Sequence, residues 1–355
     1  MRTSGILSAV PRTPPAGSAG TSTAGSAAPQ RAACPPRGPV RPMGLRQRRP
    51  DAGNEERLHP QPGLRRRYVM GDSVVVGLDG TGNSGPAVRW GAEEAAARGL
   101  PLHLLHSWVS QPLNIPIAQE AANKRRYGAE VLGSAEAMAL ELHPGISVAT
   151  EEVSEEAVDA LVDRSGRAAV MVLGSRGHGA IAGFLLGSVS LHVLGRAICP
   201  VVIVREEEGG ADQKPEMVVG VQEAGTRGEA VLDFAFAAAE AHHIGVRAVR
   251  AWEAPALVDF ASATPTPSPE EEELAAGEEK KLADILAPWR AQFPAVHVIE
   301  HVQRGRVAAV LLGACSQASL LVVGRRMQRT PMLLGPVVFA VLHHSPCPVA
   351  VVPRI

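Results

Sequence analysis

The amino-acid sequence predicts an α/β protein made of two tandem, doubly wound domains, each a Rossmann-like five-stranded parallel sheet. Short continuous runs of Val, Ile and Leu alternate with Ala-rich amphipathic stretches, and the whole succession occurs twice. Continuous apolar runs indicate strands buried on both faces, and their alternation with helices is typical of parallel βαβ units. With 45% apolar but only 3% aromatic residues, the core must consist mainly of aliphatic side chains.

An internal duplication accounts for the 355 residues. Four blocks recur in the same order, separated by 143 to 150 residues: 74–79 with 218–222, Trp108 with Trp252, 168–176 with 318–326, and 199–205 with 347–353. Chance matches would not keep a common order and spacing. We therefore predict a first domain over 70–205, a linker over 206–216 and a second domain over 217–354.

The strands follow from the apolar runs. In the first copy we expect them at about 73–78, 102–107, 146–153, 168–173 and 200–204. In the second copy we expect them at about 217–221, 246–250, 296–302, 318–323 and 348–352. Amphipathic helices are predicted after the first strand of each copy, over 86–98 and 228–241.

A further helix is predicted to begin at Ser268-Pro269-Glu270-Glu271, where a capping serine precedes a proline at the first helical position. Its apolar face is expected to comprise Leu274, Leu282, Ile285, Leu286 and Trp289. The His pairs 242–243 and 343–344 fall at expected helix ends, where solvated or capping roles fit better than metal binding.

Residues 1–68 differ from the rest of the chain. Eleven prolines and few large apolar residues predict disorder, and twelve arginines against three acids give 1–67 a charge of +9. One interpretation is a basic arm that touches nucleic acid, anionic lipid or a partner. Others are an organelle transit peptide and a translation start at Met70 or Met43 rather than Met1. The rest of the chain carries a net charge of −10, and this acidic balance argues against a nucleic-acid partner.

The sequence also favours a cytoplasmic protein without a membrane anchor. No apolar run approaches the roughly 20 residues of a spanning helix, and no secretory signal is legible. The four cysteines at 34, 199, 315 and 347 form neither a CxxC pair nor zinc-site spacing. We expect them to be reduced thiols.

A glycine-rich loop follows the predicted strand 168–173. Glycines at 174, 177 and 187 allow tight turns and close approach of the backbone to a ligand. Gly187-Ser188 then opens a helix, whose first-turn amides and positive dipole end suit a phosphate. Ser188 and Ser190 can add hydroxyl donors. The loop lies at the carboxyl end of a strand, where open α/β sheets bind ligands.

The pattern Gly174-x2-Gly177-x9-Gly187-Ser188 resembles the ATP-binding signature of universal stress proteins, and the chain from about 72 to 354 resembles the tandem form found in actinobacteria. The resemblance implies an ATP site in the first copy, with Mg²⁺ or Mn²⁺. The residues it implicates are Gly77, Asp79, Ser107, Gly174, Ser175, Arg176, Gly177, Gly187, Ser188, Val189 and Ser190. It makes Asp79 the candidate metal ligand, directly or through water, and places His106 and Ser107 on the adenine side.

Other interpretations stay open for single residues. Asp79 could simply be a turn or capping residue, and Arg176 a solvated loop residue. Gly80–Gly85 spells GxGxxG after a strand, the dinucleotide-binding fingerprint. However, the second strand ends in His106-Ser107 rather than the acid that the fingerprint requires, so a plain Gly-rich turn is favoured.

The second copy departs from the signature at each of these positions. Gln222 stands for Asp79, Met327 for Gly177, and Pro336 for Ser188, and proline has no backbone N–H to donate. Arg325, Arg326 and Arg329 could attract an anion, although solvated loop positions are favoured. We expect no ATP here, and the resemblance implies that this copy pairs with the first through strands 200–204 and 348–352. A homodimer stays open.

No catalytic signature is legible, since GxSxG, GxxxxGK[ST] and HExxH are all absent. The favoured hypothesis is an ATP-binding regulator of a stress or dormancy response, acting on an unidentified protein partner. A weak ATPase or nucleotidyl-transferring enzyme of the same fold is the second hypothesis, and a ligand-free interaction scaffold the third.

Overall fold

A computed structural model describes residues 72–81, 84–109, 117–175, 186–205, 216–222, 226–253, 269–326 and 334–354. All of them belong to the compact unit Pro62–Ile355. The predicted tail over 1–68 and the predicted linker, apart from Glu216, lie outside the described residues.

The first repeat is a strand–helix succession of the predicted kind. Its elements are β1 (Ser73–Leu78), α1 (Gly85–Arg98), β2 (Leu102–Ser107), α2 (Ile117–Leu142), β3 (Val148–Val153), α3 (Ala157–Arg164), β4 (Ala168–Gly174), α4 (Ser188–Arg196) and β5 (Val201–Val204). Each of its five predicted strands overlaps an observed strand.

The second repeat has the same order of elements. They are β6 (Glu216–Gly220), α5 (Thr226–Ala241), β7 (Gly245–Trp252), α7 (Pro269–Gln292), β8 (Val298–Arg304), α8 (Val307–Ala314), β9 (Leu320–Arg326), α9 (Pro336–His344) and β10 (Val349–Arg354). The five strands predicted for this copy are likewise confirmed.

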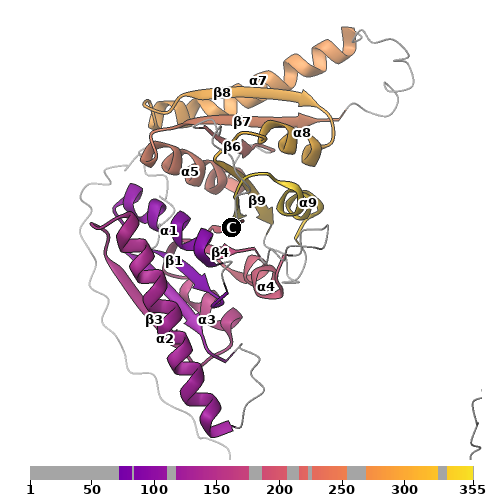
Figure 1. Cartoon of the computed structure of the whole chain (residues 1–355). Helices are drawn as coiled ribbons and strands as arrows, with labels where there is room; N and C mark the ends of the chain where they lie inside the picture. Colours follow the sequence, from indigo (N-terminus) through magenta and orange to yellow (C-terminus); the bar gives the residue numbers. More distant parts are fainter. Residues whose placement is uncertain are drawn as a thin grey trace, which may run out of the picture. The chain divides into compact units, whose positions relative to one another are not determined.

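The ten strands form one sheet in the order β3-β2-β1-β4-β5-β10-β9-β6-β7-β8. Neighbouring strands run parallel within each repeat, as the doubly wound fold requires. At the centre β5 and β10 pair antiparallel, with Val202 opposite Ala350. The predicted pairing of the two final strands within one chain is therefore confirmed. Figure 1 shows helices α4 and α9 near this junction.

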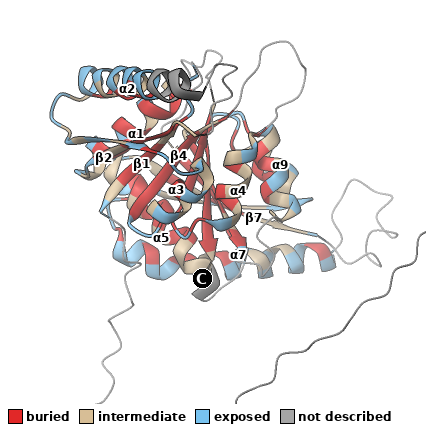
Figure 2. Ribbon diagram, turned by 90° about the horizontal axis from the view of Figure 1, so that it is seen from below, coloured by how far each residue is buried: buried red, intermediate tan, exposed pale blue. Residues whose placement is uncertain are grey.

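Both faces of the sheet are buried, as the continuous apolar runs predicted. Within β1, Val74 and Val76 belong to one apolar cluster, whereas Val75, between them, belongs to a second. Both clusters include residues of the two repeats, and the strands appear as a buried layer between partly exposed helices in Figure 2. Successive side chains of a strand point to opposite faces of the sheet, and helices cover both faces, which produces this arrangement.

Helix α7 departs from its predicted apolar face at one position. Leu282, Leu286 and Trp289 are buried, but Leu274 is 40% exposed. Leu274 therefore does not join the packed part of the predicted apolar face, although Glu271 in the first turn is buried and accepts a hydrogen bond from Arg304 at the end of β8.

Candidate functional site

The carboxyl ends of β1 and β4 lie side by side in the first repeat. Gly77 near the end of β1 is paired with Leu173 near the end of β4. The chain then leaves β1 toward α1 and β4 toward α4, which is the topological switch point of a doubly wound sheet. The predicted Asp79 turn and the predicted phosphate loop are thereby brought to one edge.

Helix α4 begins at this edge as the sequence predicted. Gly187 precedes it in an extended conformation (φ −61°, ψ 150°), and the first intrahelical bond runs from the Leu191 amide to the Gly187 carbonyl over 3.0 Å. The amides of residues 188–190 precede that bond, so the helix itself offers them no acceptor. Gly187 has no side chain that could cap them, and Ser188 is exposed. This helix end is a potential anion seat.

Ser190 joins the start of α4 to the end of β4. Its side chain is 6% exposed, and its Oγ donates to the Gly174 carbonyl oxygen over 3.5 Å. Ser175 is also buried, and its amide donates to the Val204 carbonyl over 2.8 Å, which continues the β4–β5 ladder. Arg176 and Gly177 fall in 176–185, outside the described residues.

Asp79 forms the turn that follows β1. Its Oδ1 accepts hydrogen bonds from the Thr81 amide (2.9 Å), the Thr81 hydroxyl (2.8 Å) and the Ser84 hydroxyl (2.9 Å). Gly80 between them has φ +79°, a conformation that favours glycine. The turn role held open for Asp79 is therefore present, and the Gly-rich segment serves as a turn into α1 (Gly82 lies outside the described residues).

A cavity of about 360 Å³ opens beside this turn. It is lined by residues that include Thr81 and Ser84 of the turn and Tyr127 and Met138 of α2. The Tyr127 hydroxyl donates to the Gly80 carbonyl over 2.5 Å, which fixes the turn against α2. The cavity thus adjoins the switch point on the α2 side.

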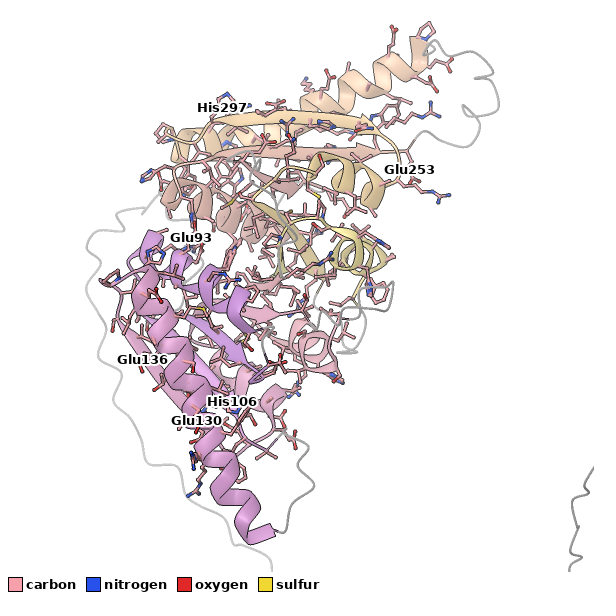
Figure 3. The ribbon with its side chains drawn as sticks, viewed as in Figure 1. Glu93, His106, Glu130, Glu136, Glu253 and His297 are labelled. Atoms are coloured by element: carbon pink, nitrogen blue, oxygen red, sulfur yellow. The ribbon has the colours of Figure 1, made fainter. Side chains whose placement is uncertain are left out.

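The residues at the end of β2 are turned into the fold. His106 is fully buried and its Nδ1 lies 2.8 Å from the Leu78 carbonyl oxygen, so the ring bridges β2 and β1 (Figure 3). The Ser107 hydroxyl donates to the Glu155 carbonyl over 2.6 Å.

Gly77 is also constrained by packing, because a Cβ there would lie 2.6 Å from a methyl carbon of Leu173.

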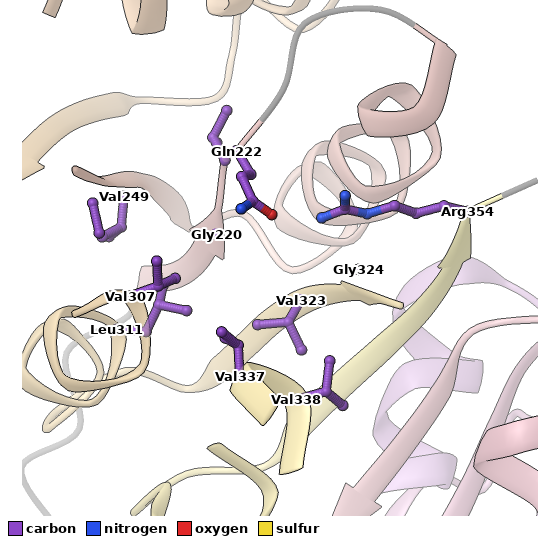
Figure 4. A pocket seen from close by; sticks show the side chains of 12 residues that line it. Gly220, Gln222, Val249, Val307, Leu311, Val323, Gly324, Val337, Val338 and Arg354 are labelled. Carbon is purple, nitrogen blue, oxygen red and sulfur yellow. The ribbon is translucent and has the colours of Figure 1, made fainter. Parts of the chain in front are cut away.

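The second repeat has the same scaffold with different chemistry. Gly335 precedes α9 with nearly the same dihedral angles as Gly187 (φ −60°, ψ 157°), but the first helical residue is Pro336. A cavity of only about 70 Å³ lies at the matching edge, lined mainly by Val and Leu side chains together with Gln222 and Arg354 (Figure 4). The Arg354 guanidinium reaches over Gly324, where it occupies the space that an added Cβ would take.

Two predictions of solvated side chains are wrong. Arg325 is 4% exposed, and it donates from Nη1 to the Gly195 carbonyl over 3.3 Å and from Nη2 to the Ala197 carbonyl, both in the first repeat. His242 contacts Glu94 of the first repeat through Nε2 at 2.6 Å, and this hydrogen bond raises the pKa of His242 despite its partial burial. Both side chains link the repeats, a role visible only once the copies are placed together.

The cysteines behave as the sequence predicted in the described part of the chain. Cys199, Cys315 and Cys347 are buried free thiols, and Cys34 lies outside the described residues. Burial raises the pKa of Cys199 to about 12, which keeps that thiol protonated and unreactive.

No group of three or more His, Cys, Asp or Glu side chains among the described residues could hold a metal ion. No described helix combines the length and the apolar character that crossing a membrane requires.

Sequence reasoning missed two residues at this edge and the role of a third at the repeat boundary. Ser84 and Tyr127 shape the Asp79 turn, and Arg325 holds the end of α4. The role of Ser84 had a signal in the sequence, because a serine five residues after an aspartate and just before a helix suggests a local hydrogen bond. The other two act over 47 and 130 residues of sequence, where no local pattern could indicate them.

Comparison with known proteins gives a consistent result. The model of the universal stress protein family matches residues 70–205 and 216–353. A universal stress protein of Mycolicibacterium smegmatis is 32% identical over 289 residues, covering 79% of this chain and 96% of that protein. One from Mycobacterium tuberculosis is 35% identical over 295 residues, covering 78% and 96%. The crystal structure of a universal stress protein from Archaeoglobus fulgidus matches with a TM-score of 0.62 at 17% identity, covering 81% and all of that chain.

Proposed function

The chain belongs to the universal stress protein family, and on this premise we propose that it is an ATP-binding stress-response regulator with one competent nucleotide site, in its first repeat. The observation that carries the proposal is the start of α4. Its first-turn amides, left without a side-chain cap at Gly187, face the carboxyl edge of the sheet beside the β1 turn.

The residues at this edge fit a triphosphate. The proposal gives the phosphates to the loop from Gly174 through Gly177, in which the Ser175 amide is already used by the β4–β5 ladder, and to the amides of Gly187, Ser188 and Val189 at the helix start. Ser190 would support the phosphate site indirectly, because its hydroxyl already donates to the Gly174 carbonyl and so connects α4 to β4. Gly77, Ser107, Ser175 and Arg176 complete the set that the family signature implicates, and the carboxyl end of β2 would border the adenine.

Mg²⁺ would be held mainly by the phosphates rather than by a protein cage. Three donors converge on Asp79 Oδ1, so Asp79 would meet the metal through Oδ2, directly or through a water molecule.

The second repeat is proposed to bind no ATP. Pro336 removes the amide that Ser188 offers at the first helical position. Gln222 replaces the carboxylate, and the Arg354 side chain fills space above Gly324. A cavity of about 70 Å³ is also too small for a nucleotide, because ligand pockets usually span roughly 300–1,000 Å³.

The second repeat itself supplies a fold-neutral test of the site. Ser188→Pro introduces the residue that the equivalent helix α9 already carries at this position, and proline suits the first helical residue. It removes one amide and one hydroxyl donor from the phosphate seat. Each charge-assisted hydrogen bond contributes about 1.5–3 kcal/mol, so we expect ATP affinity to fall by at least about tenfold in isothermal titration calorimetry.

The reverse substitution, Pro336→Ser, is the matched control and should leave ATP affinity unchanged. Equal affinity in the wild type and Ser188→Pro would contradict the site. Mass spectrometry of nucleotide retained by the purified full-length chain separates the alternatives further. A protein that neither retains nor titrates ATP would be a ligand-free scaffold, and turnover abolished by Gly177→Val would indicate a weak ATPase. We propose a cytoplasmic location, with which a nucleotide ligand and reduced thiols would be consistent.

A further inference from the structure

A buried arginine of the second repeat holds the helix that carries the proposed phosphate seat of the first. Arg325 lies in β9, at the position that Ser175 occupies 150 residues earlier in the first repeat. Serine and arginine differ in size and charge, so the first repeat has no guanidinium at the equivalent position. Arg325 is only 4% exposed, although it lies near the end of its strand.

The guanidinium reaches the last turn of α4. Nη1 donates to the Gly195 carbonyl over 3.3 Å, and Nη2 donates to the Ala197 carbonyl at the cap of that helix. The final carbonyls of a helix have no intrahelical donors, and they carry the negative end of the helix dipole. A cation placed there is stabilising, and a planar guanidinium can satisfy two carbonyls at once.

Both ends of α4 are therefore fixed, but by different repeats. At its start, the Ser190 hydroxyl holds it to Gly174 of its own repeat. At its end, Arg325 of the other repeat holds Gly195 and Ala197. A helix of nine residues is only about 13 Å long and moves as a rigid rod, so the end that Arg325 holds also sets the position of the amides at the start.

We propose that Arg325 is a positioning residue for the phosphates of ATP, through which the degenerate second repeat sustains nucleotide binding by the first. The inference rests on the proposed function, because it takes the start of α4 as the phosphate seat. It goes beyond that function by giving the second repeat a role in affinity. Nucleotide affinity then depends on the contact between the repeats, and occupancy of the site stabilises that contact in return.

The chain contains a matched contact in the opposite direction. Arg205, directly after β5, donates from Nη2 to the Leu342 carbonyl over 2.5 Å, at the end of α9. This bond also crosses between the repeats and also satisfies the last turn of a helix. However, α9 begins with Pro336 and belongs to the repeat without a proposed nucleotide site. Loss of Arg205 should therefore loosen the interface without disturbing the phosphate seat.

The test compares binding of ATP with binding of adenosine, which lacks phosphates, by the full-length chain. Arg325→Met keeps much of the side-chain volume but removes both hydrogen bonds. We expect its dissociation constant for ATP to rise about tenfold while that for adenosine stays within about twofold of the wild type. Arg205→Met should bind both ligands like the wild type, even if its melting temperature falls.

Several results would overturn the inference. Unchanged ATP affinity in Arg325→Met, with binding by the wild type intact, would overturn it and leave the proposed function standing. Equal losses for ATP and adenosine, or equal losses in both arginine variants, would show a merely structural contact. A wild type that binds neither ligand would overturn the proposed function and this inference together.

Should Arg325→Met fail to fold, Arg325→Lys keeps the proposal testable. Lysine retains the charge but cannot present the two fixed donors of a guanidinium. We expect an intermediate loss of ATP affinity, about threefold, with adenosine binding unchanged. ATP binding equal to the wild type in this variant would overturn the inference.

Discussion

Charged residues that are buried at the repeat boundary find partners in the opposite copy. Glu94 of α1 is 1% exposed and contacts Arg98 at 2.5 Å and His242 at 2.6 Å. The Arg98 guanidinium lies over the ring of Phe234, 5.2 Å from its centre. A buried carboxylate is costly unless it is paired, so this group favours the association of the two copies only while its partners are in place.

The Glu94–His242 contact predicts a pH dependence of stability. The pKa of His242 is raised in the folded protein, chiefly by its hydrogen bond with Glu94. The stabilisation is therefore complete below the unfolded-state pKa of about 6.5 and is lost as the pH rises through the folded-state pKa. We expect His242→Gln to lower the free energy of unfolding by about 1.5–3 kcal/mol at pH 5.5 and by less at pH 9.

Urea denaturation across this pH range measures the difference. The variant His301→Gln serves as a control, because the ring of that residue makes an exposed hydrogen bond with the neighbouring Gln303 side chain. A deficit for His242→Gln that stays constant with pH would show that the imidazole contributes by packing rather than by charge.

At the scale of elements, α7 is anchored by aromatic side chains that are rare in this chain. Trp289 packs 5.9 Å from Phe236 of α5 and 6.4 Å from Phe293, measured between ring centres. Most of the remaining core is aliphatic, so this cluster concentrates large buried surfaces at one place. It couples α7 to α5 on one face of the second repeat.

We expect Trp289→Ala to destabilise the protein strongly. Removing a buried tryptophan from such a cluster typically costs about 3–5 kcal/mol in free energy of unfolding, because the cavity is only partly refilled. Leu274→Ala on the same helix is the control, since an exposed position should change stability by no more than about 0.5 kcal/mol. Chemical denaturation measures both, and similar values for the two variants would refute this account of α7.

The elements were more predictable from sequence than the contacts between them. The inner strands follow from apolar runs, because strands buried on both faces leave a local signature, whereas the outer strands β3 and β8 are partly exposed and mixed in polarity. The exposure of Leu274 depends on how α7 packs against the sheet, and the burial of Arg325 depends on a helix 130 residues away. At the candidate site, the strand end at Gly174 and the helix start at Ser188 were predicted correctly, whereas the Asp79–Ser84 bond and the Tyr127 contact were not.

At the scale of the whole folded unit, one backbone ladder crosses from repeat to repeat. The antiparallel pairing of β5 with β10 turns two five-stranded sheets into one. It leaves β3 and β8 as the outer strands, and both carry charged side chains: Glu151 and Glu152 in β3, and Glu300 and Arg304 in β8. Charged outer strands oppose further pairing with other chains.

This continuity predicts cooperative unfolding. Separating the repeats would expose the β5 and β10 edges and break the Arg205, Arg325 and Glu94 contacts, so neither copy should be stable alone. We expect a single calorimetric transition for the folded unit, with van't Hoff and calorimetric enthalpies in agreement. Two resolved transitions would contradict this prediction.

The junction of β5 and β10 also has an evolutionary consequence. When two identical chains meet across a two-fold axis, any substitution alters both halves of the assembly, so a lost loop is lost everywhere. Covalent fusion removes that constraint, because the half that contributes Pro336 can change while the half that contributes Ser188 is preserved. Tethering thus permits a division of labour in which one half recognises the ligand and the other evolves as its support.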